Sequence, residues 1–156
     1  MTPAINAVKR ARVSHRVHEY EHDPRAESYG LEAAEALGQD PSQVFKTLLA
    51  QLDGRKTVVA ILPVEGRLDL KALAAAGGAK KAAMTDPQVA ERLTGYVVGG
   101  ISPVGQKRKL PTFIDRSAEG LDVVFVSAGR RGLELELAPS DLASLTSAQF
   151  AEICRL

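Results

Sequence analysis

Lys46 is the residue whose type and position most strongly suggest chemistry. Over residues 44–52 the side chains alternate as in a strand, which places Lys46 on the same face as Leu48 and Ala50. That face should point inward, where an ammonium group is unfavourable unless an anionic group meets it. Lys46 therefore either lines a cavity that receives a negatively charged ligand, or extends its ammonium group to solvent along an apolar stem.

Two glycine-bearing segments are candidates for holding an oxyanion or a phosphate. Residues 99–105 contain three glycines and a proline, and glycines let a backbone approach a ligand closely and present N–H groups to it. Residues 127–132 also follow a predicted strand, and they add Arg130 and Arg131. Taken alone, each segment is equally consistent with a tight structural turn.

The sequence offers little for conventional hydrolytic or metal chemistry. It has no Gly-x-Ser-x-Gly motif, and its one cysteine, Cys154, lies near the end of the chain on a segment that we expect to be an amphipathic helix. We assign Cys154 to packing. His15, His18 and His22 fall on a predicted strand, so their spacing does not suit a zinc-binding helix, and no metal is expected.

Length and composition predict a single domain over residues 1–156. A chain of 156 residues with 45% apolar residues can bury one substantial core but not two. It has no apolar run that suits a membrane span or a secretory signal, so we expect a soluble, cytoplasmic protein with no membrane partner. Because the net charge is only +1, contact with RNA would require local basic clusters, which occur at residues 9–12, 80–81, 107–109 and 130–131. Each cluster could also be an ordinary solvated stretch.

Hydrophobic periodicity and turn residues predict a mixed α and β fold. Helices are expected at residues 3–13, 30–37, 70–76 and 87–94, with a further helix beginning after Ser140 or Thr146. Strands are expected at residues 15–22, 44–52, 57–62, 96–98, 112–114, 123–126 and 133–137.

Particular residues mark the ends and faces of these elements. The pair Asp53-Gly54 suits a tight hairpin turn, and Asp69 suits the N-terminus of a helix. In residues 133–137, Glu134 and Glu136 alternate with leucines, which predicts a strand with one wet face.

A series of short motifs, in the same order along the chain, is shared with one protein family. The motifs lie at residues 2–4 (TPA), 20–24 (YEHDP), 44–48 (VFKTL), 68–71 (LDLK), 78–81 (GAKK), 94–103 (TGYVVGGISP), 105–107 (GQK) and 131–133 (RGL). On these motifs the chain resembles the YbaK/EbsC family of trans-acting aminoacyl-tRNA editing deacylases, which is related to the editing domain inserted in bacterial prolyl-tRNA synthetases. The resemblance covers nearly the whole chain and is strongest to the branch of cysteinyl-tRNA(Pro) deacylases.

The resemblance implies a fold and a set of site residues. The implied fold is α+β, with a mixed, partly barrel-like sheet flanked by helices, and it needs no metal or organic cofactor. The implied essential residue is Lys46, and the positions implied to bind substrate are Tyr20, Gly99, Gly100, Ile101, Ser102, Pro103 and Gly129. Two departures from the family pattern are Ala128, where a second glycine is common, and the stretch of Glu134 and Glu136, where an aspartate can occur.

The same resemblance implies the reaction and the partners. The implied activity is proofreading of translation by deacylation of Cys-tRNA(Pro), and possibly of Cys-tRNA(Cys). In this implied reaction the thiol of the substrate's cysteinyl group attacks the ester, and the cysteinyl group leaves as a cyclic thiolactone. The enzyme would be a hydrolase acting on ester bonds, or a lyase if the cyclic thiolactone is released. The implied partners are the aminoacyl-tRNA and prolyl-tRNA synthetase in a transient ternary complex, with no role for DNA.

Two other functions remain open from the sequence. One is a deacylase of the same fold that uses water to remove alanine or serine from a mischarged tRNA. The other is a noncatalytic module that binds tRNA or a synthetase. An inward lysine at position 46 disfavours the noncatalytic module, since such a module has no evident need for it.

Overall fold

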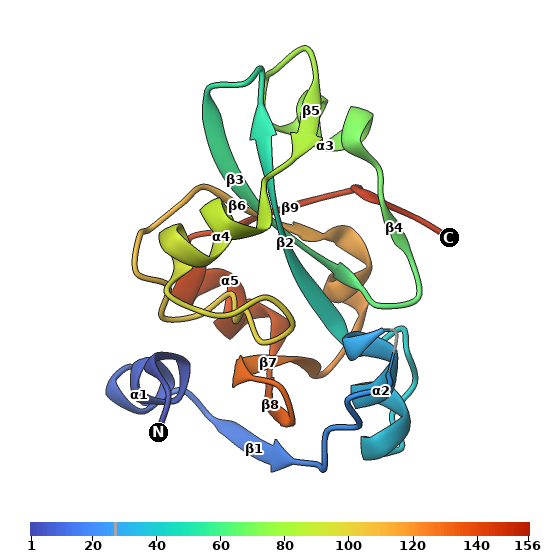
Figure 1. The fold of residues 1–156 in the computed structure, drawn as a ribbon, viewed down its shortest axis with the longest axis vertical. Coiled ribbons are helices and arrows are strands. Elements are labelled where there is room, and N and C mark those ends of the chain that lie inside the picture. The colour runs from blue at the N-terminus through green and yellow to red at the C-terminus, as the bar shows by residue number, and fades with distance from the viewer. Residues whose placement is uncertain (27) are drawn as a thin grey trace.

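Helices and strands alternate along the chain in the computed structural model, which describes residues 1–26 and 28–156 (Figure 1). The helices are α1 (Pro3–Arg10), α2 (Tyr29–Leu37), α3 (Leu70–Ala76), α4 (Pro87–Thr94), the 3-10 helix η1 (Arg116–Gly120) and α5 (Pro139–Thr146). The strands are β1 (His15–Glu19), β2 (Phe45–Leu52), β3 (Lys56–Pro63), β4 (Arg67–Leu68), β5 (Ala82–Met84), β6 (Thr112–Asp115), β7 (Val124–Arg130), β8 (Leu133–Leu137), β9 (Gln149–Ala151) and β10 (Cys154–Arg155). No helix in the described residues combines the length and the apolar character that a membrane crossing requires.

The larger sheet is built around the predicted hairpin of β2 and β3. Its strand order is β5-β2-β3-β6-β9, with antiparallel pairs on the β5 side and parallel pairs from β3 to β9. The turn residues Asp53 and Gly54 both have positive φ, 53° and 67°, and the Arg55 N–H donates to the Leu52 carbonyl at 3.0 Å, which closes a tight turn in the loop between the paired residues Leu52 and Lys56. The prediction of this hairpin is confirmed.

The smaller sheet has the order β1-β8-β7 and is antiparallel throughout. Leu133, Leu135 and Leu137 of β8 point into the main core. A parallel bridge between Val44 and Phe125 joins this sheet to the start of β2. Together with the short pair β10-β4, the described strands form three sheets and no closed barrel, so the mixed α+β class is confirmed.

The second face of the smaller sheet is covered, which makes the predicted wet face wrong. Phe125 of β7 lies on this face and packs with Ala33 and Ala34 of α2. Glu134 therefore has only 6% of its surface exposed. The alternation of leucine and glutamate correctly predicted which side chains share a face of β8. It carries no information about what packs on the face that holds Glu134 and Glu136.

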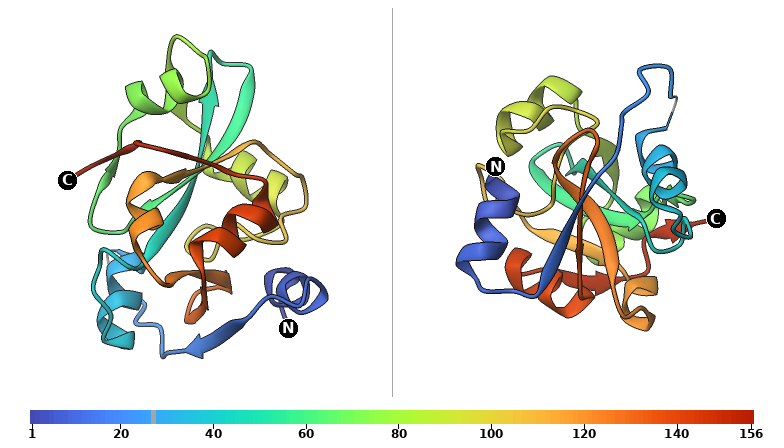
Figure 2. Two further views of the ribbon diagram at one scale, coloured as in Figure 1. Left: turned by 180° about the vertical axis from the view of Figure 1, so that it is seen from behind. Right: turned by 90° about the horizontal axis from the view of Figure 1, so that it is seen from below.

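The helices use the capping residues that the sequence provides. Thr2, Ser28, Asp69 and Asp86 each accept a hydrogen bond from a backbone N–H in the first turn of α1, α2, α3 and α4. α1, α4 and α5 contribute to the main core between the two sheets, whereas α3 packs on the other side of the larger sheet (Figure 2).

Two sequence predictions about secondary structure are wrong. Residues 96–98 form a turn rather than a strand, because the buried Tyr96 hydroxyl donates to the Val104 carbonyl and folds this loop back on itself. The last helix ends at Thr146, and Cys154 lies in β10 rather than on a helix. The buried carboxylate of Asp115 holds this C-terminal segment extended by accepting the backbone N–H groups of Ile153 and Cys154, both at 3.0 Å.

Candidate active site

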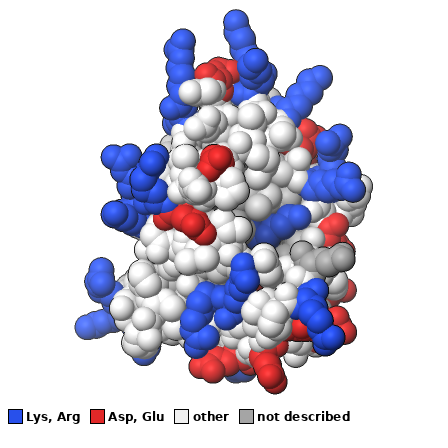
Figure 3. All heavy atoms as spheres, viewed as in Figure 1, with Lys and Arg blue, Asp and Glu red and all other residues white. Residues whose placement is uncertain are grey.

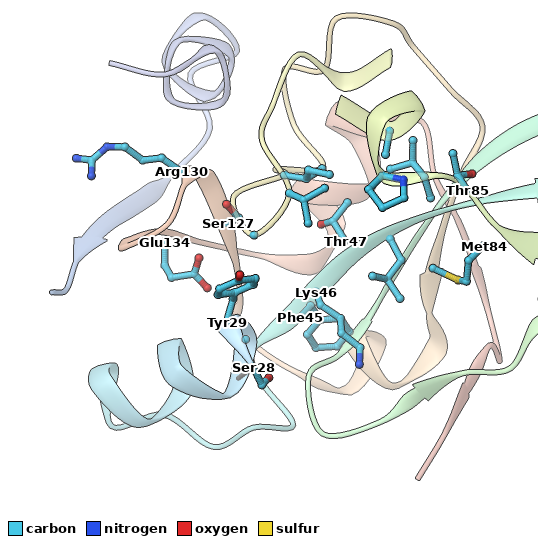
Figure 4. Close-up of a pocket in the computed structure, with 18 of the residues that line it drawn as sticks. Ser28, Tyr29, Phe45, Lys46, Thr47, Met84, Thr85, Ser127, Arg130 and Glu134 are labelled. Carbon is cyan, nitrogen blue, oxygen red and sulfur yellow. The ribbon is translucent and has the colours of Figure 1, made fainter. Parts of the chain in front are cut away.

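A cavity of about 410 Å³ lies between the two sheets, with α2 on one side of it (Figure 4). This volume is typical of sites for small ligands. The wall is made by residues from several segments: Tyr20, residues 28–30 at the start of α2, residues 45–49 of β2, Met84, Thr85, Pro87, Ala90, Val98, Gly99 and Ile101, and Ser127, Arg130 and Glu134 of the smaller sheet. Segments far apart in the sequence therefore meet at one cavity.

Lys46 lines this cavity, as its place in the strand pattern suggested. It is half-buried, and its Nζ donates a hydrogen bond to the carbonyl of Gly66 at 2.7 Å. Burial lowers the pKa of Lys46, with Cys154 opposing and Arg67 adding to this effect. An ammonium group has three N–H donors, so Lys46 can still donate to a ligand.

Two hydroxyl groups in the cavity wall have no hydrogen-bond partner. Among the described residues, the buried side-chain oxygen and nitrogen atoms without a partner are Oγ1 of Thr47 and Oγ1 of Thr85, and both residues line this cavity. A buried polar group without a partner costs free energy. The cavity is therefore suited to a ligand that supplies hydrogen-bonding groups.

A bulge in β7 brings two further polar side chains to the wall. Ser127 pairs with Glu134, but the next regular pair joins Arg130 to Leu133, so the register shifts between them. Gly129 lies in this bulge with φ of 115°, a conformation that side chains other than hydrogen rarely allow. The bulge places both Ser127 and Arg130 in the cavity wall, with the Arg130 guanidinium pointing away from the cavity.

Glu134 is the acidic side chain of the cavity wall. Burial raises the pKa of this carboxyl group from its ordinary value of 4.5 to about 8. Tyr20 also lines the cavity, and burial together with the nearby Glu134 raises the pKa of its hydroxyl to about 12. Figure 4 shows Glu134 and Thr85 at opposite sides of the cavity, so its polar groups are spread along its length.

A stacked pair of side chains borders the cavity next to residues 98–101. The Arg131 guanidinium lies 4.1 Å from the centre of the Tyr29 ring, and its Nη2 donates to the carbonyl of Val98 at 3.1 Å. Arg131 thereby ties α2 to this loop. Since Arg131 is exposed, its charge is accessible from solvent.

The structure places the predicted site residues in two groups. Four of them, Tyr20, Lys46, Gly99 and Ile101, line the cavity. The other four, Gly100, Ser102, Pro103 and Gly129, stand outside its wall. The resemblance-based roles of all eight, catalytic for Lys46 and substrate-binding for the other seven, stay a prediction.

The second group supports the cavity from behind. A side chain at Gly100 would come within 2.6 Å of the Arg130 Cα, so this glycine lets the loop approach the bulge of β7. Ser102 is fully buried and its Oγ accepts the N–H of Val104. These contacts give Gly100 and Ser102 a structural role in addition to the predicted one.

Several lining residues were not singled out from the sequence. They are Tyr29, Thr47, Met84 and Thr85, whereas Ser127 and Arg130 belong to the candidate segment 127–132. Thr47 adjoins Lys46 in a shared motif, which was the one available signal for it. The others reach the cavity through long-range packing that local patterns do not encode.

The hydroxyl groups of the wall lack the partners of a conventional nucleophile. Oγ of Ser28 accepts the N–H of Leu31, and Oγ of Ser127 accepts the N–H of Gly129. No serine or threonine hydroxyl of the wall bonds a histidine, a carboxylate or an amine within the described residues. An activated protein nucleophile would need such a base.

The histidines are engaged elsewhere. Nε2 of His18 lies 2.7 Å from Oε1 of Glu136, and Nδ1 of His22 lies 2.8 Å from Oε1 of Glu32. The described residues contain no cluster of three or more metal-ligating side chains.

Comparison with known proteins places this chain in a family. The sequence pattern of the family "Aminoacyl-tRNA editing domain" matches residues 23–145. The chain is 41% identical over 155 residues to EbsC of Enterococcus faecalis, a proposed Cys-tRNA(Pro)/Cys-tRNA(Cys) deacylase, covering 97% of this chain and 92% of that one. It is 26% identical over 125 residues to the uncharacterised protein YwhH of Bacillus subtilis, covering 80% of this chain and 79% of that one.

A solved structure agrees with these relationships. The crystal structure of a proposed trans-editing enzyme for prolyl-tRNA synthetase superposes with a TM-score of 0.84 at 25% identity, covering 100% of this chain and 99% of that one. Sequence and fold thus agree over nearly the full length, and the chain belongs to the aminoacyl-tRNA editing domain family.

Proposed function

We propose that this protein is a trans-acting deacylase that clears Cys-tRNA(Pro), and also Cys-tRNA(Cys), in the cytoplasm. The observation that carries the proposal is a cavity that holds Lys46 and unpartnered hydroxyl groups, but no nucleophile paired with a base in the described residues. Membership of the editing family and the 41% identity to EbsC support it.

In the proposed reaction the substrate supplies the nucleophile. The cysteinyl sulfur attacks the ester carbonyl and forms a C–S bond, while the ester C–O bond to the terminal ribose breaks. The thiol proton passes to the ribose oxygen, which leaves as a hydroxyl group, and the cysteinyl group departs as a cyclic thiolactone. The protein then contributes position and hydrogen bonds rather than a covalent intermediate.

Lys46 and the loop of residues 99–102 have separate proposed roles. Lys46 has N–H donors left after its bond to Gly66, and we assign them to the terminal phosphate or ribose of the tRNA. The backbone around Gly99 and Ile101, which lines the cavity, would hold the aminoacyl group.

Comparison of charged tRNAs tests the source of the nucleophile. Initial rates are measured for Cys-, Ser- and Ala-tRNA(Pro) at equal concentration, and Cys-tRNA(Pro) should be cleaved fastest, because a thiol ionises far more readily than a hydroxyl. Alkylation of the substrate thiol should stop the reaction. Similar rates for cysteine and alanine would favour a water molecule that the enzyme positions.

Two variants separate chemistry from packing. Lys46→Ala should abolish deacylation in a single-turnover assay while the thermal melt remains cooperative. Cys154→Ser should leave deacylation nearly unchanged, because this thiol lies in β10 and is no part of the cavity wall. Full activity in Lys46→Ala would remove Lys46 from the mechanism.

We further propose that recognition of the tRNA body depends on prolyl-tRNA synthetase in a ternary complex. Figure 3 shows positive side chains in several separate groups on one face, and the net charge is only +1. Binding of tRNA alone should therefore be weak and steeply salt-dependent. Neutralising Lys107, Arg108 and Lys109 should weaken binding and flatten the salt dependence. Strong selection of tRNA(Pro) by the isolated protein would count against the complex.

A further inference from the structure

Glu134 is a buried carboxyl group that faces the cavity and has no partner in the described part of the chain. Its cross-strand neighbours are His18 on β1 and Ser127 on β7. The His18 ring bonds Glu136 instead, and the Ser127 hydroxyl accepts the N–H of Gly129. Neither neighbour therefore neutralises Glu134.

The cations of the cavity wall are also engaged elsewhere. Lys46 donates to the carbonyl of Gly66, and its ammonium group points away from Glu134 in Figure 4. The guanidinium of Arg130 likewise points away from the cavity, and its Nη2 lies 4.0 Å from Oε1 of Glu19. Among the described wall residues Glu134 is the one carboxylate, so a cation that compensates it must come from the ligand.

An aminoacyl-tRNA carries one cationic group near its ester, the α-ammonium of the amino acid. The ribose hydroxyls can donate hydrogen bonds to a carboxylate but carry no positive charge to balance it, and the phosphates are anionic. We infer that Glu134 binds this free α-amino group and so restricts the protein to aminoacyl-tRNAs whose amino group is unblocked. The inference rests on the proposed function and assigns the group that recognises the amine.

Glu134 should also discriminate against other charged tRNAs in translation. An N-acylated aminoacyl group, as in peptidyl-tRNA, has no ammonium to offer to Glu134. The carboxyl group would then remain buried without a partner, which is unfavourable. The protein should therefore spare peptidyl-tRNA and other N-acylated aminoacyl-tRNAs.

The protonation of the pair gives a direct signature of the contact. With a pKa of about 8, Glu134 is mostly protonated at neutral pH in the empty cavity. A free α-amino group has a pKa of about 7.7–8.0 and is mostly protonated as well. Before binding, the carboxyl group and the amino group each carry an extra proton. In the bound pair an ionised carboxylate faces the ammonium group, so only one of the two protons remains, and binding should release close to one proton.

Two non-hydrolysable probes isolate the amine. The first is 3′-amino-3′-deoxyadenosine acylated with cysteine through an amide bond, and the second is the same nucleoside acylated with 3-sulfanylpropanoic acid, which lacks only the α-amino group. By calorimetry the wild-type protein should bind the first probe about 10- to 100-fold more tightly than the second at neutral pH. Repeating the titration in buffers of different ionisation enthalpy counts the protons released.

Variants of two glutamates on one strand provide the control. Glu134→Gln should remove both the preference for the amine probe and the proton release, whereas Glu134→Asp should retain part of each. Glu136→Gln is the matched control, because Glu136 lies two residues along on the same face of β8 and stands outside the cavity wall. That variant should behave as wild type with both probes.

Outcomes for the inference and for the proposed function are distinct. If wild type binds the amine probe no more tightly than the desamino probe, or if Glu134→Gln keeps the preference, the inference is overturned. Failure of wild type to cleave any charged tRNA, with the preference for the amine probe intact, overturns the proposed reaction instead. Cleavage of N-acetyl-Cys-tRNA as fast as Cys-tRNA also contradicts the role of Glu134.

Discussion

Replacing Glu134 by glutamine should stabilise the protein near neutral pH, even though it removes a group that we assign to substrate binding. Burial raises the pKa of Glu134 from 4.5 to about 8. Between these values the unfolded chain releases the proton while the folded chain keeps it, so the free energy of unfolding falls as the pH rises. Each pH unit in this window costs about 1.4 kcal/mol, which amounts to about 3 kcal/mol between about pH 5 and pH 7.

The assay compares urea and thermal unfolding of wild type and Glu134→Gln over this pH window. Glutamine has no proton to lose, so the stability difference should grow by about 3 kcal/mol from about pH 5 to pH 7 and level off above about pH 8. At pH 7 this corresponds to a rise in Tm of roughly 6–12 °C. Charged and titratable groups around the site, including His18, Tyr20 and Arg130, are common to both proteins and cancel in the difference.

Glu136→Gln serves as the control here too. Glu136 is the more exposed of the two glutamates, and it bonds His18 at 2.7 Å, so its replacement should lower stability slightly and without this pH profile. A stability difference between wild type and Glu134→Gln that stays constant across the window would refute the reasoning. It would mean that the folded protein accommodates the ionised carboxylate as easily as water does.

Three further substitutions test the surroundings of the site. Asp115→Ala should lower the free energy of unfolding by about 2–4 kcal/mol in a urea titration, because the buried Asp115 carboxylate accepts the backbone N–H groups of Ile153 and Ser117. A loss below about 1 kcal/mol would argue against this role. Thr85→Val should leave the free energy of unfolding unchanged or raise it by up to about 1 kcal/mol, since the Thr85 hydroxyl has no partner in the described residues. Its kcat/KM should fall. A clear loss of stability would show that the hydroxyl has a partner. Gly129→Ala should lower the free energy of unfolding by about 1–3 kcal/mol, measured by thermal melting, because φ is 115° and a Cβ would lie 2.9 Å from Cε1 of Tyr96. An unchanged melt would show that the bulge tolerates a side chain at this position.

Elements with local signals could be predicted from the sequence. The hairpin turn at Asp53-Gly54 and the N-cap at Asp69 formed as expected, because each depends on the conformational preference or the side-chain oxygen of one or two residues. The inward position of Lys46 also follows from a local pattern, since alternation along one strand determines which side chains share a face.

Errors arose where distant contacts override local preference. The apolar run at residues 96–98 suits a strand, but a hydrogen bond from the Tyr96 hydroxyl holds it as a turn. The C-terminal residues suit a helix, yet the Asp115 carboxylate binds their backbone N–H groups and keeps them extended. Glu134 is buried on the face where α2 packs against Phe125 of β7, and no pattern within β8 could reveal that packing.

The distribution of unpartnered polar groups separates the cavity from the rest of the fold. Asp115 and Ser102 are buried polar residues, and both are hydrogen-bonded. The hydroxyl groups of Thr47 and Thr85 lack partners in the described chain, desolvation alone shifts the pKa of Glu134, and all three residues line the cavity.

These unpartnered groups oppose folding, so they persist only where another requirement outweighs stability. A ligand that satisfies them removes that cost when it binds, and its binding free energy then adds to the stability of the folded state. Lys46 differs from them, because the Gly66 carbonyl already fixes its ammonium group in the empty cavity. The cation is thus preorganised for an anionic partner, whereas the carboxyl group of Glu134 stays protonated until a cation arrives. Binding should begin with the phosphate or ribose at Lys46, and recognition of the amine at Glu134 should then decide whether the aminoacyl group is held for cleavage.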